Sequence, residues 1–147
     1  MKITIIGTGY VGLTSAVCFA DKGHDVICVD KDECKIESLN NKIPTIYEDG
    51  LQELLAKLVD SGNIEFTTDI RHGVTNSQLI LLAVGTPQDE NTGEANLQYI
   101  FEASKECAEF VSEYKLFVTK STVPVGTNHK IKQIIEGEAN TVSYTHL

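Results

Sequence analysis

The chain has 147 residues, of which 41% are hydrophobic. This size fits one ordinary domain with a buried core and argues against two domains. Its 12 Lys and Arg residues are opposed by 21 Asp and Glu residues, which gives a formal net charge of -9 at pH 7. Because such an excess of acid repels a phosphate backbone, we expect no nucleic-acid partner.

The sequence also lacks the pattern of a targeting or membrane segment. The apolar stretch that follows Lys2 is interrupted by three glycines, whereas the core of a signal peptide is continuously apolar. The longest unbroken apolar run is 79–84, far short of the roughly 18 residues of a membrane helix. We therefore expect a cytoplasmic protein with no membrane partner.

The four cysteines and four histidines are scattered, without the spacing of a metal site or a C-x-x-C pair. We therefore expect no metal. Three of the cysteines lie in apolar or periodic runs, where a thiol acts as a small hydrophobe: Cys18, Cys28 and Cys107. We interpret these three as packing residues and nominate no cysteine nucleophile.

In chain order, the first strand is expected at 3–6 and the first helix at 11–20, with Gly23 as the helix stop. A second strand at 26–29 precedes a short helix marked by Ile36 and Leu39. The clearest amphipathic helix is 51–59, where leucines and a valine recur at i, i+3, i+4, i+7 and i+8. The remaining elements are expected as strand 64–68, strand 79–84, helix 97–111, strand 116–119 and helix 131–137.

Alternation of strands and helices through the whole chain predicts an α/β fold with a doubly wound parallel sheet. We expect the strand order 3-2-1-4-5, which is typical of a Rossmann-type dinucleotide-binding domain. No linker divides the chain, so residues 1–137 are expected to form one NAD-binding domain. Residues 138–147 follow neither period and are expected to be an atypical tail.

The strongest chemical signal is the run Gly7-Thr8-Gly9-Tyr10-Val11-Gly12, a G-x-G-x-x-G motif between the first strand and first helix. The first glycine allows the tight turn, the second allows a pyrophosphate to approach the backbone, and the third allows close packing of helix on strand. The start of the helix offers free N–H groups to the phosphates. Candidate cofactor-binding residues are therefore Gly7, Gly9, Tyr10, Val11 and Gly12.

A second signal, Asp30, closes the second strand about 20 residues beyond the glycines, where an acid accepts hydrogen bonds from the ribose hydroxyls. It argues against the simpler alternative, a glycine-rich turn that binds nothing. The same carboxylate would repel a 2′-phosphate, so NAD is favoured over NADP. The neighbouring Lys31 could accept a phosphate, but we interpret it as a solvated loop lysine.

The fourth and fifth strands end in turns at the same expected cleft. The fourth is followed by Gly85-Thr86-Pro87, where the Thr86 hydroxyl could reach a dinucleotide, although an ordinary turn explains the spacing equally well. The fifth is followed by Ser121-Thr122-Val123-Pro124-Val125-Gly126-Thr127. We expect the hydroxyls of this run to face the nicotinamide end.

These runs resemble the nucleotide-sugar 6-dehydrogenase family, from residue 1 to about residue 136. The resemblance is carried by the start of the chain up to Leu13, by Ile46-Tyr47-Glu48-Asp49-Gly50-Leu51, by Val84-Gly85-Thr86-Pro87, and by Lys120 with the threonine run after it. It implies that NAD contacts Val11, Asp30, Lys35, Thr86 and Thr122. It further implies that Thr122 lies near the reacting centre, which makes it the one catalytic candidate.

Family members oxidise the C6 alcohol of a sugar nucleotide, as in UDP-glucose to UDP-glucuronate, and reduce two NAD per turnover through a cysteine thioester. The resemblance leaves open whether the sugar nucleotide is UDP-glucose, GDP-mannose or UDP-N-acetylmannosamine. The family's catalytic glutamate, central helix, cysteine nucleophile and sugar-nucleotide domain have no match in this sequence. We therefore expect an inactive fragment that binds NAD, with the sugar nucleotide and a homo-oligomer as partners of the full-length protein.

The sequence departs from the family pattern at two positions, with Asp49 in place of a proline and Asn96 in place of an aspartate. Asn96 can still cap the helix expected after it. Two alternatives remain: a non-enzymatic NAD-sensing regulatory domain, and the cofactor domain of another nucleotide-sugar or hydroxyacid dehydrogenase. Neither the 47–51 run nor the 121–127 run is needed by a regulatory domain.

Overall fold

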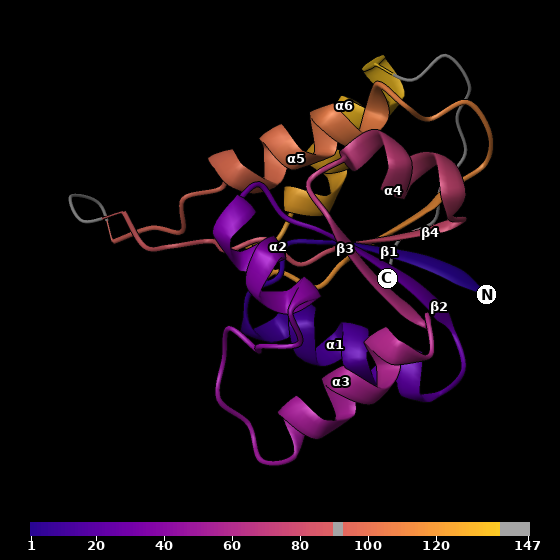
Figure 1. Ribbon diagram of the computed structural model, residues 1–147. Coiled ribbons are helices and arrows are strands. Elements are labelled where there is room, and N and C mark those ends of the chain that lie inside the picture. Colours follow the sequence, from indigo (N-terminus) through magenta and orange to yellow (C-terminus); the bar gives the residue numbers. More distant parts are fainter. Residues whose placement is uncertain (90–92, 139–147) are drawn as a thin grey trace.

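The computed structural model describes residues 1–89 and 93–138. The tail expected at 138–147 falls, apart from Glu138, outside the described residues. Strands and helices alternate along the chain (Figure 1). In order they are β1 (Lys2–Ile6), α1 (Tyr10–Asp21), β2 (Asp25–Val29), α2 (Glu33–Asn40), α3 (Leu51–Asp60), β3 (Ile64–Thr67), α4 (Ile70–Asn76), β4 (Leu79–Leu82), α5 (Gln98–Ala108), β5 (Leu116–Thr119) and α6 (Thr127–Glu138).

All paired strands run parallel, in the order β3-β2-β1-β4-β5. This confirms the expected doubly wound α/β sheet and its strand order. The chain moves outward from β1 through β2 to β3 and then returns to place β4 on the other side of β1. The carboxyl ends of β1 and β4 therefore flank the point where the strand order reverses, the usual ligand position in such sheets.

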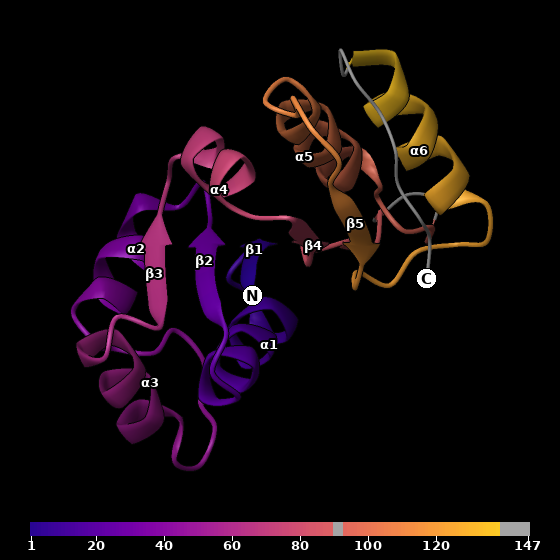
Figure 2. The same ribbon diagram turned by 90° about the vertical axis from the view of Figure 1, so that its right-hand side faces the viewer.

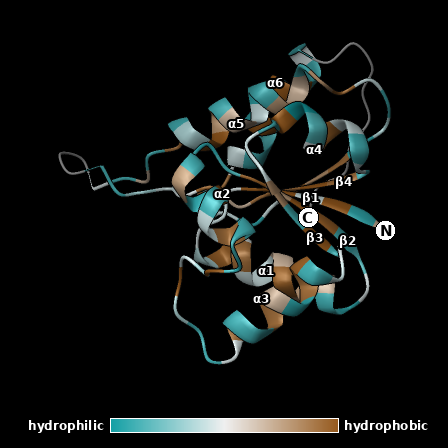
Figure 3. Cartoon of the chain, viewed as in Figure 1, coloured by the Kyte–Doolittle hydropathy of each residue, from teal (hydrophilic) through white to brown (hydrophobic). Residues whose placement is uncertain are grey.

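Two apolar cores lie on opposite faces of the sheet. Helices α1, α2 and α3 cover one face, and α4, α5 and α6 cover the other (Figures 1 and 2). Alternate residues of each strand serve the two cores, as in β1, where Ile3 and Ile5 pack on the first and Ile6 on the second. Hydrophobic residues accordingly gather along the strands in Figure 3.

The helix expected at 51–59 is confirmed as α3, with Leu51, Leu55 and Leu58 buried on one face. Asn96 was expected to cap the next helix, but α5 begins at Gln98 and its N-cap residue is Leu97, which makes no side-chain cap hydrogen bond. The Asn96 side-chain oxygen accepts instead from the Gln98 N–H at 2.9 Å, one residue before the N-cap. Helix α6 begins earlier than expected, at Thr127, directly after Gly126. No helix within residues 1–89 and 93–138 has both the length and the apolarity to cross a membrane.

Two further features of the fold differ from expectation. Helix α4 was not predicted, because its seven residues are mostly polar and carry no helical apolar stripe; Asp69 caps it by accepting from the His72 N–H at 3.0 Å. Cys18 was expected to pack in the core but is exposed, whereas Cys28 and Cys107 are buried as expected. The residues of α1 are small or apolar on almost every side, so their pattern gave no guide to the buried face.

Candidate functional site

A cavity of about 500 Å³ opens at the carboxyl ends of β1, β2 and β4. This volume falls in the ordinary range for a small-molecule or cofactor site, about 300 to 1,000 Å³. The glycine turn forms part of the cavity floor, and the residues after β2 form one side. Residues of α4 and α5 form the opposite wall. Four of the sequence-predicted residues line it together: Gly7, Gly9, Asp30 and Lys35.

The glycine turn is packed so closely that side chains are excluded at two of its three glycines. Gly7 has a φ of 99°, and a Cβ there would lie 2.7 Å from the Ala83 carbonyl oxygen. A Cβ on Gly12 would lie 1.9 Å from the Gly7 carbonyl oxygen. Gly9 differs, since a Cβ there would meet nothing within 4 Å. The space over Gly9 is therefore open for a ligand, as pyrophosphate binding requires.

Thr8, the residue between the first two glycines, holds the carboxylate of Asp30. Its N–H and its hydroxyl both donate to Asp30 Oδ2 at 2.7 Å, and Thr8 itself is only 1% exposed. The Asp32 N–H donates to Asp30 Oδ1 at 3.1 Å. The glycine turn thus fixes the orientation of the acid, and a carboxylate has lone pairs left for ribose hydroxyls.

These contacts keep Asp30 ionised. Partial burial acts to raise the pKa of Asp30, but the hydrogen bonds from the Thr8 hydroxyl, the Thr8 N–H and the Asp32 N–H, with the charge of Lys35, outweigh it. The pKa of Asp30 therefore lies below its ordinary value of 3.8. A fixed, ionised acceptor at this position suits the hydroxyls of a ribose and opposes a second anion.

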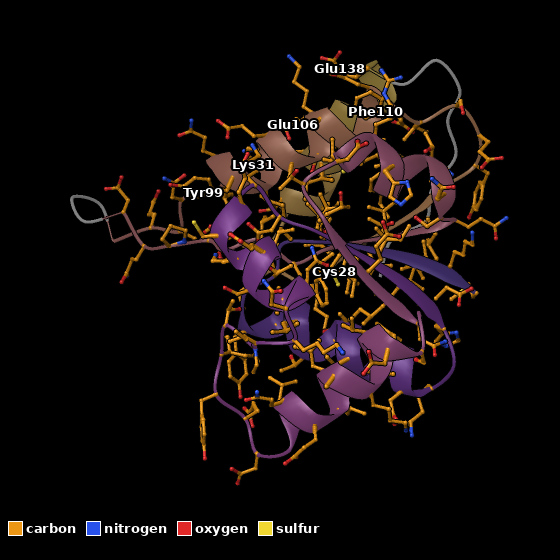
Figure 4. All side chains as sticks on the ribbon, in the orientation of Figure 1. Cys28, Lys31, Tyr99, Glu106, Phe110 and Glu138 are labelled. Atoms are coloured by element: carbon orange, nitrogen blue, oxygen red, sulfur yellow. The ribbon has the colours of Figure 1, made fainter. Side chains whose placement is uncertain are left out.

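Each of the two lysines that line the cavity lies beside a carboxylate. Lys35, on α2, approaches Asp32 at 3.8 Å, and Asp32 also caps α2 by accepting from the Lys35 N–H. Lys31 reaches across the cavity to Glu106 on α5, with 2.8 Å between Nζ and Oε1. Figure 4 shows Lys31 and Glu106 close together, with Tyr99 nearby.

The wall opposite Asp30 is formed by residues that the sequence analysis did not name. Ile70 begins α4, and Tyr99 and Ala103 lie on α5. Ile70 was missed because α4 itself was not predicted. Tyr99 and Ala103 belong to a predicted helix, but only the fold shows that this part of the helix faces the glycine turn. These largely apolar side chains suit the face of an aromatic base.

The second half of the predicted site lies beyond β4 and β5. The Thr86 hydroxyl donates to the Thr122 carbonyl oxygen at 2.9 Å, and the two hydroxyl oxygens are 3.3 Å apart. The Ser121 hydroxyl donates to the Val84 carbonyl oxygen at 2.7 Å, which joins the two turns. Thr86 and Thr122 are thus brought together although 36 residues separate them.

The remaining predicted residues do not line the cavity. Tyr10 and Val11 are 56% and 42% exposed at the start of α1, and Gly12 lies against the turn. Thr86 and Thr122 are also outside the lining, although their neighbours Gly85 and Pro87 belong to it. The cavity therefore gathers four of the nine predicted residues, and the other five follow β1, β4 and β5 at the same edge of the sheet.

The chain's thiols stand apart from this cavity. Among the residues that the structure describes, no cysteine lines the cavity. Burial, with a smaller effect of Asp30, raises the pKa of Cys28 far above its usual range, and burial likewise raises the pKa of Cys107 to about 12. Among the described residues, no group of three or more His, Cys, Asp or Glu side chains is placed to hold a metal ion.

The sequence was compared with proteins of known family. Residues 1–146 match the model of the UDP-glucose/GDP-mannose dehydrogenase family, NAD binding domain. A UDP-glucose 6-dehydrogenase of Rhizobium meliloti is 50% identical over 92% of this chain and 31% of its own length. UDP-glucose 6-dehydrogenase TuaD of Bacillus subtilis is 48% identical over 92% of this chain and 29% of its own length. The chain thus spans about a third of the length of these relatives.

Solved structures agree with the sequence comparison. A UDP-glucose dehydrogenase from Pyrobaculum islandicum superposes with a TM-score of 0.93 at 33% identity, over 99% of this chain and 34% of that chain. A GDP-mannose dehydrogenase from Pseudomonas aeruginosa, in a ternary complex, superposes with a TM-score of 0.94 at 35% identity, over 99% of this chain and 35% of that chain. The open space over Gly9 and the ionised Asp30 fit the NAD that this family binds. The chain belongs to the UDP-glucose/GDP-mannose dehydrogenase family and forms its NAD-binding domain.

Proposed function

We propose that this chain serves as the NAD-binding part of a dehydrogenase that oxidises UDP-glucose to UDP-glucuronate. UDP-glucose is favoured as the sugar nucleotide because the relatives that are 50% and 48% identical are UDP-glucose 6-dehydrogenases, whereas the GDP-mannose dehydrogenase is 35% identical. The single observation that carries the NAD-binding role is the Thr8–Asp30 contact beside the open glycine turn. In its bound state NAD supplies the acceptor for a hydride from the alcohol carbon.

We assign the adenosine half of NAD to the cavity. Asp30 accepts hydrogen bonds from the ribose hydroxyls, and Gly9 leaves room for the pyrophosphate near the start of α1. Tyr10 and Val11, at the exposed start of that helix, lie where they can cover the phosphates. Lys35 lies at the ribose side and adds a positive charge beside Asp30.

The nicotinamide half is assigned to the turns after β4 and β5. Thr86 and Thr122 present two hydroxyl groups 3.3 Å apart, on separate turns of the same cleft edge. We propose that both contact the cofactor and that Thr122 also lies next to the reacting alcohol. The role of Thr122 there is to hold and orient the substrate hydroxyl by hydrogen bonding, because a threonine hydroxyl neither loses nor gains a proton near neutral pH and so cannot serve as the general base.

We further propose that residues 1–147 by themselves bind NAD without oxidising UDP-glucose. Oxidation through a thioester needs a thiolate near the reacting carbon. Cys28 and Cys107 are buried, Cys18 and Cys34 are exposed on helices, and none of the four lines the cavity. Two free thiols exposed to solvent suit a reducing compartment, so we place the protein in the cytoplasm.

The test combines binding with turnover. NAD binding to the 147-residue chain is measured by calorimetry, and NADH absorbance is followed with NAD and UDP-glucose present. We expect saturable NAD binding and no NADH formation, and a homologous full-length dehydrogenase serves as the positive control for the assay. Absence of NAD binding would overturn the proposed site, and cysteine-dependent NADH formation would overturn the assignment of the catalytic thiol to residues outside this chain.

A further inference from the structure

One ion pair in the cleft, between Lys31 and Glu106, has no role in the function proposed above. Lys31 directly follows Asp30 at the end of β2, and its ammonium lies 2.8 Å from a carboxylate oxygen of Glu106 on α5 (Figure 4). Both residues line the same cavity as Asp30. The pair therefore joins the two walls of the cleft at its adenosine end.

We propose that Glu106 contributes to cofactor specificity by holding Lys31 away from the ribose 2′ position, where the lysine could otherwise bind the 2′-phosphate of NADP. This proposal rests on NAD binding in the cavity as proposed above. It adds to the repulsion expected from Asp30, because a site can reject a ligand both by repelling its charge and by withholding a partner for it.

The charges around the cavity support this role. A 2′-phosphate carries about -1.5 to -2 at neutral pH and is normally met by Lys or Arg. Lys31 and Lys35 are the ammonium groups among the described lining residues, and the carboxylates there are Asp30, Asp32 and Glu106. Lys35 already lies beside Asp32, and Lys31 already lies beside Glu106. The positive charge of each lysine is therefore already offset in part by a neighbouring carboxylate.

The position of Lys31 makes it the lysine that matters. It is next in sequence to the ribose-binding acid, and its side chain is 69% exposed, so it is free to turn once its partner is removed. Glu106 is set on the opposite wall by α5, whose Ala103 and Cys107 are buried in the core. The helix thus fixes the backbone of Glu106 on the far wall, whereas the Lys31 side chain lies largely in solvent.

The expected effect is modest, because both side chains are partly exposed. Exposed ion pairs of this kind change equilibria by about two- to fivefold. We therefore expect Glu106→Gln to strengthen NADP binding about two- to fivefold and to change NAD binding by less than about twofold. The change should shrink as salt concentration rises, since salt screens the attraction of the freed lysine for the phosphate.

Calorimetric titration of NAD and NADP into four variants tests the proposal. Glu109→Gln is the matched control: it removes the same charge from the same end of α5, and Glu109 is exposed and outside the cavity lining. It should leave the NAD-to-NADP affinity ratio unchanged. Lys31→Gln and the double variant Lys31→Gln with Glu106→Gln then show whether Glu106 acts through Lys31.

If Glu106 acts through Lys31, the gain in NADP affinity from Glu106→Gln disappears in the Lys31→Gln background. An equal gain in both backgrounds would show that Glu106 repels the phosphate directly, which overturns the proposal. An unchanged ratio in Glu106→Gln, with NAD still bound, would overturn it as well. Failure of the unaltered chain to bind NAD would instead overturn the proposed site itself.

Discussion

The two halves of the cleft are built in different ways. The half formed by β1, α1 and β2 is defined by backbone and buried groups: the closely packed Gly7 and Gly12, and Thr8 bonded twice to Asp30. The half formed after β4 and β5 is defined by side chains, with Thr86 and Thr122 joined by hydrogen bonds on exposed turns. The first half therefore has little conformational freedom, whereas the second half is shaped by two hydroxyl groups that can rotate.

We therefore expect the two halves to contribute differently to NAD binding. A rigid half has little conformational entropy to lose, so it can supply most of the affinity for NAD. Exposed hydroxyls that bond to each other can exchange that bond for one to a ligand, which suits orientation of the reacting end. Substitutions in the first half should therefore have large effects on folding or binding, and those in the second half small effects on both.

The largest effect is expected from Gly12→Ala. The added Cβ would lie 1.9 Å from the Gly7 carbonyl oxygen, so α1 must move away from the turn. We expect the free energy of unfolding to fall by about 2 kcal/mol or more, with loss of NAD binding. Urea denaturation measures the change. Gly137→Ala is the control, since a Cβ there meets nothing within 4 Å in a helix, and it should be neutral or stabilising.

Gly9→Ala separates binding from folding. Gly9 has a φ of -70°, which alanine accepts, and a Cβ there meets nothing within 4 Å in the chain. We expect the free energy of unfolding to stay within about 0.5 kcal/mol, while NAD affinity falls more than about tenfold because the methyl group occupies the phosphate space. Unchanged NAD affinity in a folded Gly9→Ala chain would show that the pyrophosphate does not cross this turn.

A smaller effect is expected from Thr8→Val, which keeps the shape of the side chain and removes one hydrogen bond to Asp30. We expect a loss of about 1.5 kcal/mol in stability at pH 7, the lower end of the range for a hydrogen bond to a charged group, because Asp30 is only partly buried. Thr8→Ser, which retains the hydroxyl, should keep the greater part of this stability. Urea denaturation of the three chains at pH 7 provides the comparison.

The same variant has a defined pH dependence. Asp30 has a pKa below its ordinary value of 3.8 in the folded chain. Its contribution to stability is therefore present above pH 3.8 and is lost as the pH falls through the lower folded value. Thr8→Val should raise the folded pKa of Asp30. The free energy of unfolding of the Thr8→Val chain should therefore fall less steeply on acidification than that of the unaltered chain. An equally steep fall in both would contradict the role of Thr8.

The smallest effect is expected from Thr86→Val in the second half. It removes an exposed hydrogen bond to the Thr122 carbonyl oxygen, so stability should change by less than about 1 kcal/mol and NAD affinity by less than about fivefold. Thermal unfolding with and without NAD measures both. A loss of NAD affinity as large as that of Gly9→Ala would mean that the two halves share the binding energy equally.

Much of the fold could be predicted from local sequence, but contacts across the fold could not. The glycine spacing and the apolar runs indicated the turn, the strand order and the place of Asp30. Thr8 carried no signal in the motif, because its partner lies 22 residues away. Glu106 lies 75 residues from Lys31, and nothing local marks the two as neighbours.

We propose that the cavity binds NAD through Asp30 and discriminates against NADP. Thermal unfolding of the 147-residue chain, measured with rising concentrations of NAD and then of NADP, tests it most directly. Ligand at about a hundred times its dissociation constant stabilises the folded state by about 2.7 kcal/mol, so even weak binding is visible at millimolar concentration. We predict a clear rise in Tm with NAD, a much smaller one with NADP, and a narrower difference between the two, with weaker NAD binding, in Asp30→Ala. Equal rises in Tm with both cofactors in the unaltered chain would show that Asp30 does not discriminate against NADP.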